Sequence, residues 1–153
     1  MKRQRITIGS IVEIIVDNNY YCYAQILGKA SYAFFDYRSK KQLKDLDALS
    51  LAPVLFIISV YDDVVTKGHW LKVGKMDMRD DFKIFPLQFV QDVMNHSKYS
   101  IYNPNTGEMR DAKREECINL ECAAVWEAKH VEIRLRDYYN RNNNSTVENL
   151  SLK

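Results

Sequence analysis

Residues 11–38 read IVEIIVDNNYYCYAQILGKASYAFFDYR, and this stretch decides the fold of the chain. Val12, Ile14 and Val16 alternate with other residues, which is the period of two of a half-buried strand. On this pattern Glu13 should face water. The triplet Asp-Asn-Asn at 17–19 favours a turn, because these side chains tolerate left-handed backbone angles. A hairpin is therefore predicted, with its second strand at 20–27.

The strand at 20–27 and a third strand at 31–38 extend this hairpin into a meander. Cys22, Ala24 and Ile26 are small or medium side chains on one face, and they suit the interior of a tight barrel. Residues 31–38 are rich in aromatic side chains, which are enriched in strands. We therefore predict a strongly bent antiparallel meander up to about residue 40.

The remaining strands are predicted from apolar runs. Residues 54–60 form a continuous apolar, β-branched run after Pro53, which predicts a central strand covered on both faces. The pattern favours further strands at 70–76, 84–93 and 98–102, and between 115 and 126 it favours a turn of helix followed by a strand.

Helical periodicity is clearest in residues 128–141, whose apolar side chains recur at steps of three and four. This predicts an amphipathic helix. Residues 142–153 show no periodicity and little apolar content, so we expect a loose tail. The predicted fold class is α+β: a strongly curved antiparallel β-sheet or partial barrel with a C-terminal α-helix packed on it. Residues 1–141 are expected to form a single domain.

The composition is that of an ordinary globular domain. The chain has 153 residues, of which 46% are hydrophobic and 27% charged, and its formal net charge is only +2. Such a charge is far from that of a general nucleic-acid binder. No apolar run approaches the ~20 residues that cross a bilayer. The N-terminus has no signal-peptide pattern, so a cytoplasmic location without a membrane span is expected.

The sequence contains no arrangement typical of catalysis. Three histidines and three cysteines are the candidate bases, nucleophiles and metal ligands: His69, His96, His130, Cys22, Cys117 and Cys122. The histidines lack HxH or HExxH spacing, and the cysteines form no CxxC pair. No GxSxG elbow or glycine-rich phosphate loop occurs. We therefore expect no catalytic residues, metal or cofactor, and we interpret the cysteines as small buried apolar residues.

The aromatic content is the most informative feature for function. The chain has 10 tyrosines, 6 phenylalanines and 2 tryptophans, and exposed tyrosines make large, rigid contacts in protein interfaces. The same tyrosines could instead pack sheet against helix. The two aspartates at 62–63 likewise divide between capping a short helix and contacting a partner. The candidate partner-contacting residues are Tyr21, Tyr23, Tyr37, Arg38, Asp62, Asp63 and Trp70.

Several segments, spread over most of residues 5–140, resemble the immunity protein 26 family. They include Ile8-Gly9, YAQILG at 23–28, YAFFDYR at 32–38, PVLF at 53–56, VYDD at 60–63, Trp70 with KVGK at 72–75, AAVW at 123–126, HVE at 130–132 and RLRD at 134–137. The resemblance implies a cytoplasmic, non-enzymatic antidote of bacterial polymorphic-toxin systems, including contact-dependent growth inhibition. Such a protein binds the toxic C-terminal domain of its cognate toxin and acts by occlusion.

Two alternative functions remain open at this stage. Some family members carry a phosphotriesterase label, which would make the chain a small hydrolase. A small β-barrel can also bind RNA by stacking bases on tyrosines, although the near-neutral charge argues against this and no direct nucleic-acid contact is expected. If the toxin is a nuclease, its cleft is cationic and the aspartates of this chain would complement it.

Overall fold

The first three strands form the antiparallel meander that the period-two pattern predicts. The computed structural model describes residues 3–153. β1 (Ser10–Val16) pairs with β2 (Tyr20–Gly28), and β2 pairs with β3 (Ser31–Ser39). Asp17 and Asn18 adopt left-handed φ angles of 56° and 50°, as the first turn requires. Lys29 and Ala30 do the same in the second turn, with φ angles of 51° and 63°.

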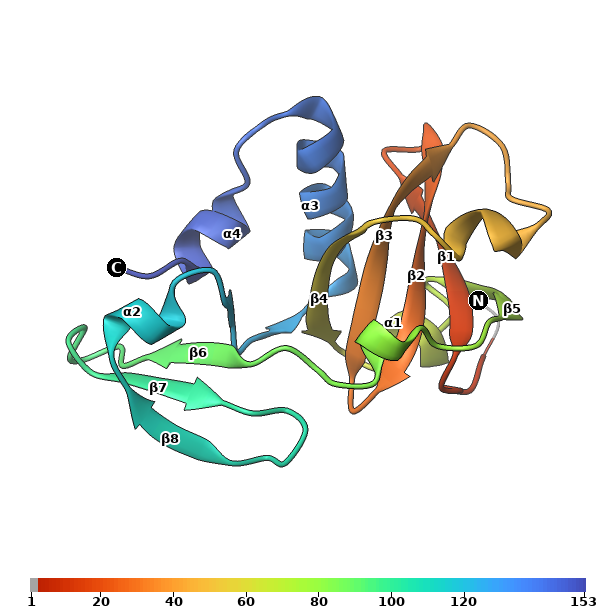
Figure 1. The fold of residues 1–153 in the computed structure, drawn as a ribbon. Helices are drawn as coiled ribbons and strands as arrows, with labels where there is room; N and C mark the ends of the chain where they lie inside the picture. Colours follow the sequence, from red (N-terminus) through yellow and green to blue (C-terminus); the bar gives the residue numbers. More distant parts are fainter. Residues whose placement is uncertain (1–2) are drawn as a thin grey trace.

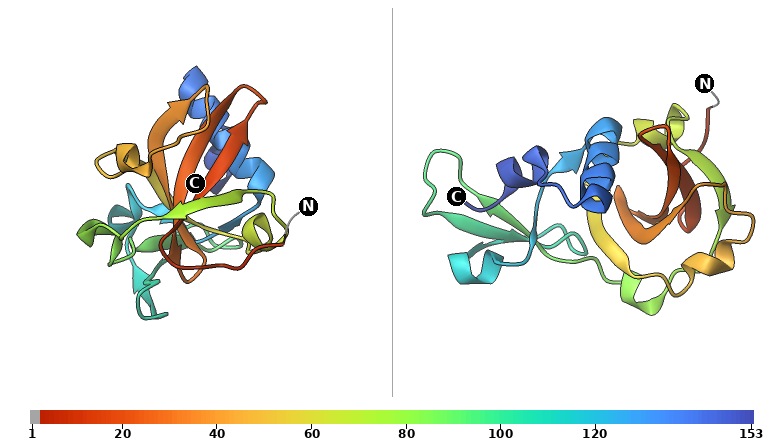
Figure 2. Two further views of the ribbon diagram at one scale, coloured as in Figure 1. Left: turned by 90° about the vertical axis from the view of Figure 1, so that its right-hand side faces the viewer. Right: turned by 90° about the horizontal axis from the view of Figure 1, so that it is seen from above.

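Three further strands extend the meander into a six-stranded sheet with the order β10-β4-β3-β2-β1-β5. β4 (Val54–Val60) pairs antiparallel with β3, β5 (Leu71–Lys75) pairs antiparallel with β1, and β10 (Val125–Trp126) pairs parallel with β4. The sheet curls strongly without closing, and helix α3 (Ala128–Asn140) lies beside its open side (Figures 1 and 2). The predicted α+β fold, a curved sheet with a C-terminal helix packed on it, is confirmed.

The inner core lies between the curved sheet and α3. Val131 and Leu135 of α3 are fully buried against the β1 side chains Val12, Ile14 and Val16. Apolar side chains spaced three or four residues apart share one helix face, so the periodicity of residues 128–141 correctly predicted the packed face. The helix therefore covers the side of the core that the strands leave open.

The prediction of a central strand at 54–60 is wrong in its placement. β2 and β3 are the central strands, and β4 lies toward the edge, with only the two-residue β10 on its outer side. Ile57 and Ser59 of β4 are partly exposed, whereas Ile58 and Val60 are buried. A continuous apolar run fits this position because both faces of β4 are partly covered. The inner core covers one face, and a second apolar core on the outer side of the sheet covers part of the other.

The prediction that Glu13 faces water is also wrong. Glu13 is only 6% exposed, and its carboxylate accepts hydrogen bonds from the Tyr23 hydroxyl and from Gln42, each at 2.9 Å. The outer face of the sheet is covered by a second apolar core that includes Phe35, Leu49 and Phe82. These side chains come from β3 and from the short helices η1 (Leu46–Leu49) and η2 (Asp80–Phe82).

A second sheet lies beside the first and has the order β8-β7-β6-β9 (Figure 1). Its strands are β6 (Gln88–Gln91), β7 (Tyr99–Tyr102), β8 (Met109–Ala112) and β9 (Glu121–Cys122). β6 is shorter than the predicted strand at 84–93, which Pro86 interrupts, and β8 was not predicted. A turn at 103–107 joins β7 to β8, with Gly107 at a φ of 79°.

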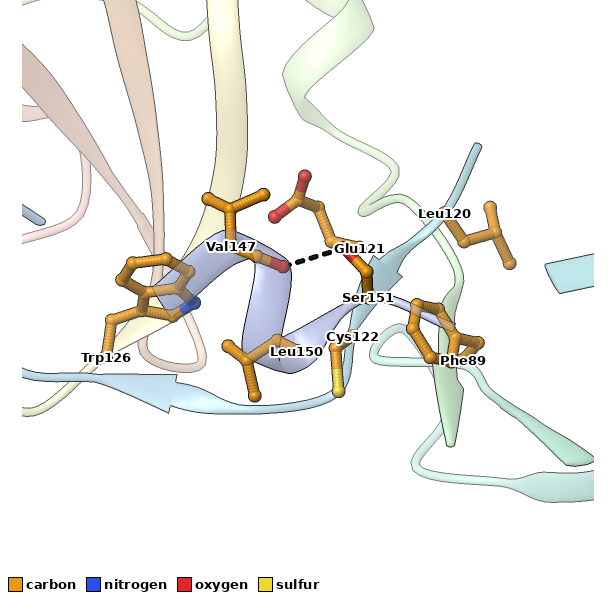
Figure 3. Close-up of a pocket in the computed structure, with 8 residues that line it drawn as sticks. All are labelled: Phe89, Leu120, Glu121, Cys122, Trp126, Val147, Leu150 and Ser151. Atoms are coloured by element: carbon orange, nitrogen blue, oxygen red, sulfur yellow. Dashed lines mark hydrogen bonds between the residues drawn. The ribbon is translucent and has the colours of Figure 1, made fainter. Parts of the chain in front are cut away.

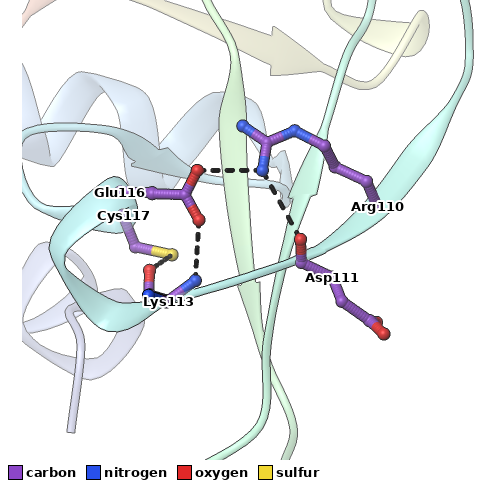
Figure 4. A network of polar contacts seen from close by, with 5 residues as sticks. All are labelled: Arg110, Asp111, Lys113, Glu116 and Cys117. Atoms are coloured by element: carbon purple, nitrogen blue, oxygen red, sulfur yellow. Dashed lines mark hydrogen bonds and ion pairs between the residues drawn. The ribbon is translucent and has the colours of Figure 1, made fainter.

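The short helix α2 (Arg114–Cys117) follows β8, and one carboxylate ties the two together (Figure 4). Glu116 accepts hydrogen bonds from the Lys113 backbone N–H at 2.8 Å and from the Arg110 guanidinium at 2.9 Å. These bonds hold the pKa of Glu116 below its ordinary value of 4.5.

The segment 142–153, expected to be a loose tail, carries the helix α4 (Ser145–Leu150). Asn144 is buried and caps this helix, because its side chain accepts from the Val147 N–H at 2.9 Å and donates to Asp137 of α3 at 2.8 Å. Lys153 then exchanges backbone hydrogen bonds with the side-chain amide of Gln91 on β6. The segment is thus bonded to both α3 and the second sheet.

Candidate functional site

The predicted site tyrosines lie on or under the outer face of the first sheet. Tyr21 and Tyr37 are half-buried, whereas Tyr23 is fully buried. The Tyr23 hydroxyl accepts from the Leu43 backbone N–H at 2.7 Å and donates to Glu13 at 2.9 Å. Burial raises the pKa of Tyr23, so its hydroxyl stays protonated and keeps this donor. Tyr23 therefore anchors the covering loop, and only Tyr21 and Tyr37 reach the surface.

Trp70 belongs to the inner core. Only 1% of it is exposed, and its ring makes edge contacts with Tyr32 and Phe34 at centroid distances of 6.1 and 5.8 Å. Its indole N–H donates to Glu132 of α3 at 3.0 Å. Trp70 therefore positions a carboxylate of α3 and presents little surface of its own.

A shallow acidic hollow lies where β4 ends and α3 begins. It is lined by Tyr61, Asp63, His69, Glu127, Ala128, Lys129 and Glu132. Three of these residues are acidic and one is a lysine, and Tyr61 is 52% exposed. The Tyr61 N–H donates to the Trp126 carbonyl at 3.1 Å, which brings the end of β4 beside the start of α3. We call these residues, together with the exposed Asp62 next to them, the acidic hollow.

The aspartate pair at 62–63 does not cap a helix through its side chains. Helix α1 (Asp63–Thr66) begins after Asp62, whose side chain makes no capping hydrogen bond. The Asp62 carbonyl instead accepts from the Thr66 N–H at 3.0 Å. The proposed capping role is therefore wrong for the Asp62 carboxylate, and the contact with a partner remains a prediction.

Arg38 lies at the opposite end of the first sheet, close to the last residues of α3. Its guanidinium carbon is 4.6 Å from the ring centroid of Tyr139 and 5.2 Å from that of Tyr20. Tyr139 donates its hydroxyl to Asp36 at 3.1 Å, and Tyr138 donates to the same carboxylate at 3.4 Å. Burial is the main cause that raises the pKa of Tyr139, which keeps this hydroxyl a donor. We call these five residues the Arg38 cluster.

A partly buried ion pair joins α3 to the second sheet. Arg134 of α3 donates two hydrogen bonds to Glu121 of β9, at 2.9 and 3.1 Å. The guanidinium carbon also lies 3.7 Å from the Phe56 ring centroid and 5.0 Å from that of Trp126. Such a forked, stacked arrangement is specific to arginine. It fixes the position of the second sheet relative to the first.

Figure 3 shows a small pocket close to this joint, between α4 and β9. Its lining is largely apolar, with Phe89 and Cys122 from the second sheet, Val147 and Leu150 from α4, and Trp126 from β10. The Ser151 hydroxyl is turned back to the Val147 carbonyl at 2.7 Å. The pocket therefore offers no free polar group from Ser151 for chemistry.

The candidate bases and nucleophiles do not assemble into a metal site within residues 3–153, where no three His, Cys, Asp or Glu side chains converge. His69, His96 and His130 are exposed and lie after α1, between β6 and β7, and on α3. Burial raises the pKa of Cys22 to about 12, so its thiol is protonated at neutral pH. No helix in this part of the chain has the length and apolar character to cross a membrane.

The fold and these surfaces define a small binding domain: a curved sheet closed by a helix, with charged and aromatic side chains exposed at both ends. The chain belongs to the immunity protein 26 family, whose model matches residues 7–100. It is therefore an immunity protein, and family membership implies that its partner is a cognate toxin protein. Neither the curated proteins nor the solved structures gave a match.

The family match covers only part of each candidate surface. It includes Arg38, Asp62 and Asp63, but it ends in β7 and so excludes α3. Sequence reasoning missed Tyr20, Asp36 and Tyr139 of the Arg38 cluster and Glu132 of the hollow. The sequence signal for this cluster was the pair of tyrosines at 138–139, which lies within the apolar stripe predicted for residues 128–141.

Proposed function

We propose that this immunity protein neutralises a nuclease toxin domain by occlusion, in the cytoplasm of a bacterium that uses contact-dependent growth inhibition. The acidic hollow is the observation that carries the proposal. Its carboxylates come from two separate parts of the chain, with Asp63 after β4 and Glu127 and Glu132 at the start of α3. The fold therefore concentrates negative charge at one place in a chain whose overall net charge is +2.

A nuclease supplies the matching surface. A cleft that binds the phosphates of DNA or RNA needs Lys and Arg side chains, and these are left exposed when the substrate is absent. An inhibitor with opposite charge gains a faster association rate and a defined orientation on such a cleft. The exposed Tyr61 ring beside the carboxylates adds the aromatic contact that is common at the centre of protein interfaces.

The mechanism requires no chemistry by this chain. A bound protein that covers ~800 Å² of the toxin excludes nucleic acid from the cleft beneath it. The hollow is well supported for this role, because Trp70 holds Glu132 from the inner core at 3.0 Å. A carboxylate that is already positioned loses less side-chain entropy when it binds.

The test uses the full chain and the toxin domain encoded by the neighbouring gene. We expect one equivalent of the chain to abolish degradation of DNA or RNA by that domain. The variant Asp62→Asn/Asp63→Asn should weaken inhibition about tenfold, mainly through slower association at low salt. The matched control Asp77→Asn/Asp111→Asn removes the same charge from two other exposed positions.

The outcomes separate the parts of the proposal. A toxin domain that degrades nucleic acid equally well with and without the chain would contradict the proposed function. Equal weakening by the control variant would show that the acidic hollow is not the contact surface. A neutralised toxin without nuclease activity would leave the immunity function intact and refute the nuclease assignment.

A further inference from the structure

The Arg38 cluster presents an arginine whose charge is not paired. Within residues 3–153, four arginines form ion pairs with carboxylates, namely Arg79, Arg110, Arg134 and Arg136, and Arg38 is not among them. Arg38 is exposed. The nearby Asp36 carboxylate is engaged by the hydroxyls of Tyr138 and Tyr139 instead. The forked donors of Arg38 therefore remain available to a partner.

The rings beneath Arg38 hold it in place. Tyr20 is only 6% exposed, and its ring meets that of Tyr139 edge to face at a centroid distance of 5.8 Å. Asp36 fixes the Tyr139 hydroxyl at 3.1 Å. A guanidinium stacked on two fixed rings loses little freedom when it binds, which is how arginine becomes a strong anchor in an interface.

The charges around Arg38 select an anionic partner. Lys40, Lys41 and Arg141 are all exposed at the same end of the sheet, where β3 and α3 finish. Lys40 bonds only a neutral acceptor there, Asn19, at 2.8 Å. The exposed Asp17 and the tyrosine-bonded Asp36 lie at this end as well, so the four cations leave it with a net positive charge, whereas the hollow at the start of α3 is acidic.

Both ends can face one partner. Glu132 of the hollow and Tyr139 of the Arg38 cluster are seven residues apart on α3 and so lie on the same flank of the helix, about 10 Å apart. An interface of ~800 Å² spans that distance easily. Tyr138, which is 49% exposed, contacts the Tyr139 ring at a centroid distance of 5.1 Å and offers a further apolar surface next to the ring on which Arg38 lies.

We propose that Arg38 is an anchor for the toxin and that it binds an aspartate or glutamate side chain of the toxin domain through its forked N–H groups. This rests on the proposed function only in that the partner is the cognate toxin. A carboxylate matches the planar fork with two parallel hydrogen bonds.

The test measures binding kinetics of the full chain to the toxin domain encoded by the neighbouring gene. Arg38→Gln should weaken binding by about 30-fold or more, mainly through faster dissociation. Arg38→Lys keeps the charge but loses the two parallel N–H donors, so its affinity should lie between those of Arg38→Gln and the unmodified chain. Lys41→Gln, the control for loss of one exposed cation at this end, should change the affinity by less than about threefold.

A charge exchange provides the second arm. Arg38→Glu should abolish binding, and replacement of the contacted toxin carboxylate by arginine should restore it. A purely structural role of Arg38 would lower the melting temperature without such restoration. Thermal melts of every variant are therefore recorded alongside the kinetics.

Each result bears on a separate claim. Absence of binding by the unmodified chain contradicts the proposed function itself. Binding that survives Arg38→Gln and Arg38→Glu overturns the anchor and leaves that function standing. A single-stranded RNA oligonucleotide serves as the competing probe: loss of RNA binding in Arg38→Gln, with toxin binding unchanged, would assign the site to phosphate and also overturn the anchor.

Discussion

Replacement of Arg134 by alanine tests how the two sheets are held together. Arg134 is the side chain on α3 that bonds Glu121 of β9 twice, at 2.9 and 3.1 Å, while it stacks on Phe56 of β4. Its side chain is 12% exposed and that of Glu121 is 35% exposed. Arg134→Ala removes the donors and the stacking together, and it leaves the Glu121 carboxylate without its partner.

The expected loss of stability follows from these exposures. Breaking a fully buried pair costs about 3–5 kcal/mol, and breaking an exposed one costs about 0.2–1 kcal/mol. Because about a third of Glu121 is open to water, we place the pair at about 1.5–2 kcal/mol. Loss of the cation–π contacts adds about 0.5–1 kcal/mol. The free energy of unfolding should therefore fall by about 2–3 kcal/mol, which lowers Tm by about 5–10 °C in a chain of this size.

Urea unfolding of the full chain measures this loss. Glu121→Gln and the double variant complete a thermodynamic cycle, which isolates the interaction between the two side chains. Arg134→Lys is the matched control, and it should lose about half as much because it retains the charge without the fork. A loss below about 0.5 kcal/mol for Arg134→Ala, or additive effects in the cycle, would refute the view that this pair joins the sheets.

Three other predictions concern the parts of the structure that the sequence did not reveal. Asn144→Ala should lower the free energy of unfolding by about 1–2 kcal/mol, because it removes the cap of α4 and a buried hydrogen bond to α3. The control is Asn143→Ala at an exposed position, and equal melting temperatures of the two variants would contradict the prediction. Asn105→Ala should cost about 1–2 kcal/mol, because the amide bonds both the N–H and the carbonyl of Phe85, and faster hydrogen exchange of the Phe85 amide would report the loss. The pKa of Glu116 is lowered from 4.5, so its contribution to stability is present above pH 4.5 and is lost as the pH falls below that value. Urea unfolding across this range should show that the free energy of unfolding depends less on pH in Glu116→Gln than in the unmodified chain. An equal pH dependence in the two would contradict a stabilising role of the hydrogen bonds that Glu116 accepts.

The parts of the fold that follow from local pattern were predictable from the sequence. The alternation in β1, the turn residues at 17–19 and the spacing of apolar residues in α3 depend on neighbours within a few positions. These local preferences agree with the global fold, which is usual for natural sequences. The three strands of the meander and the helix at 128–140 were therefore predicted correctly.

The errors arose where distant segments decide the environment of a residue. Glu13 has the pattern of an exposed residue, but the loop that carries Gln42 covers it. The run at 54–60 has the composition of a central strand, yet strand order depends on pairings that no local pattern encodes. The helix α4 had a readable signal, because Asn144 precedes Ser-Thr-Val-Glu, a good sequence for a helix start.

The candidate site was less predictable than the fold. Arg38, Asp62 and Asp63 are exposed or border an exposed hollow, and their contact with a partner stays a prediction. Trp70 and Tyr23 were selected for their aromatic rings, but both are buried supports. Arg38 and Tyr139 are a hundred positions apart, so their stacking becomes visible only in three dimensions.

The position of α3 at the far end of the chain shapes how the protein is made. The helix at 128–140 covers the core whose first strand is β1, so it is synthesised roughly 6 to 25 seconds after that strand at usual rates of translation. During this interval the concave face of the meander has no cover and presents Val12, Ile14 and Val16 to the cell interior. The chain can therefore bury these three side chains against α3 only after residues 128–140 have been synthesised.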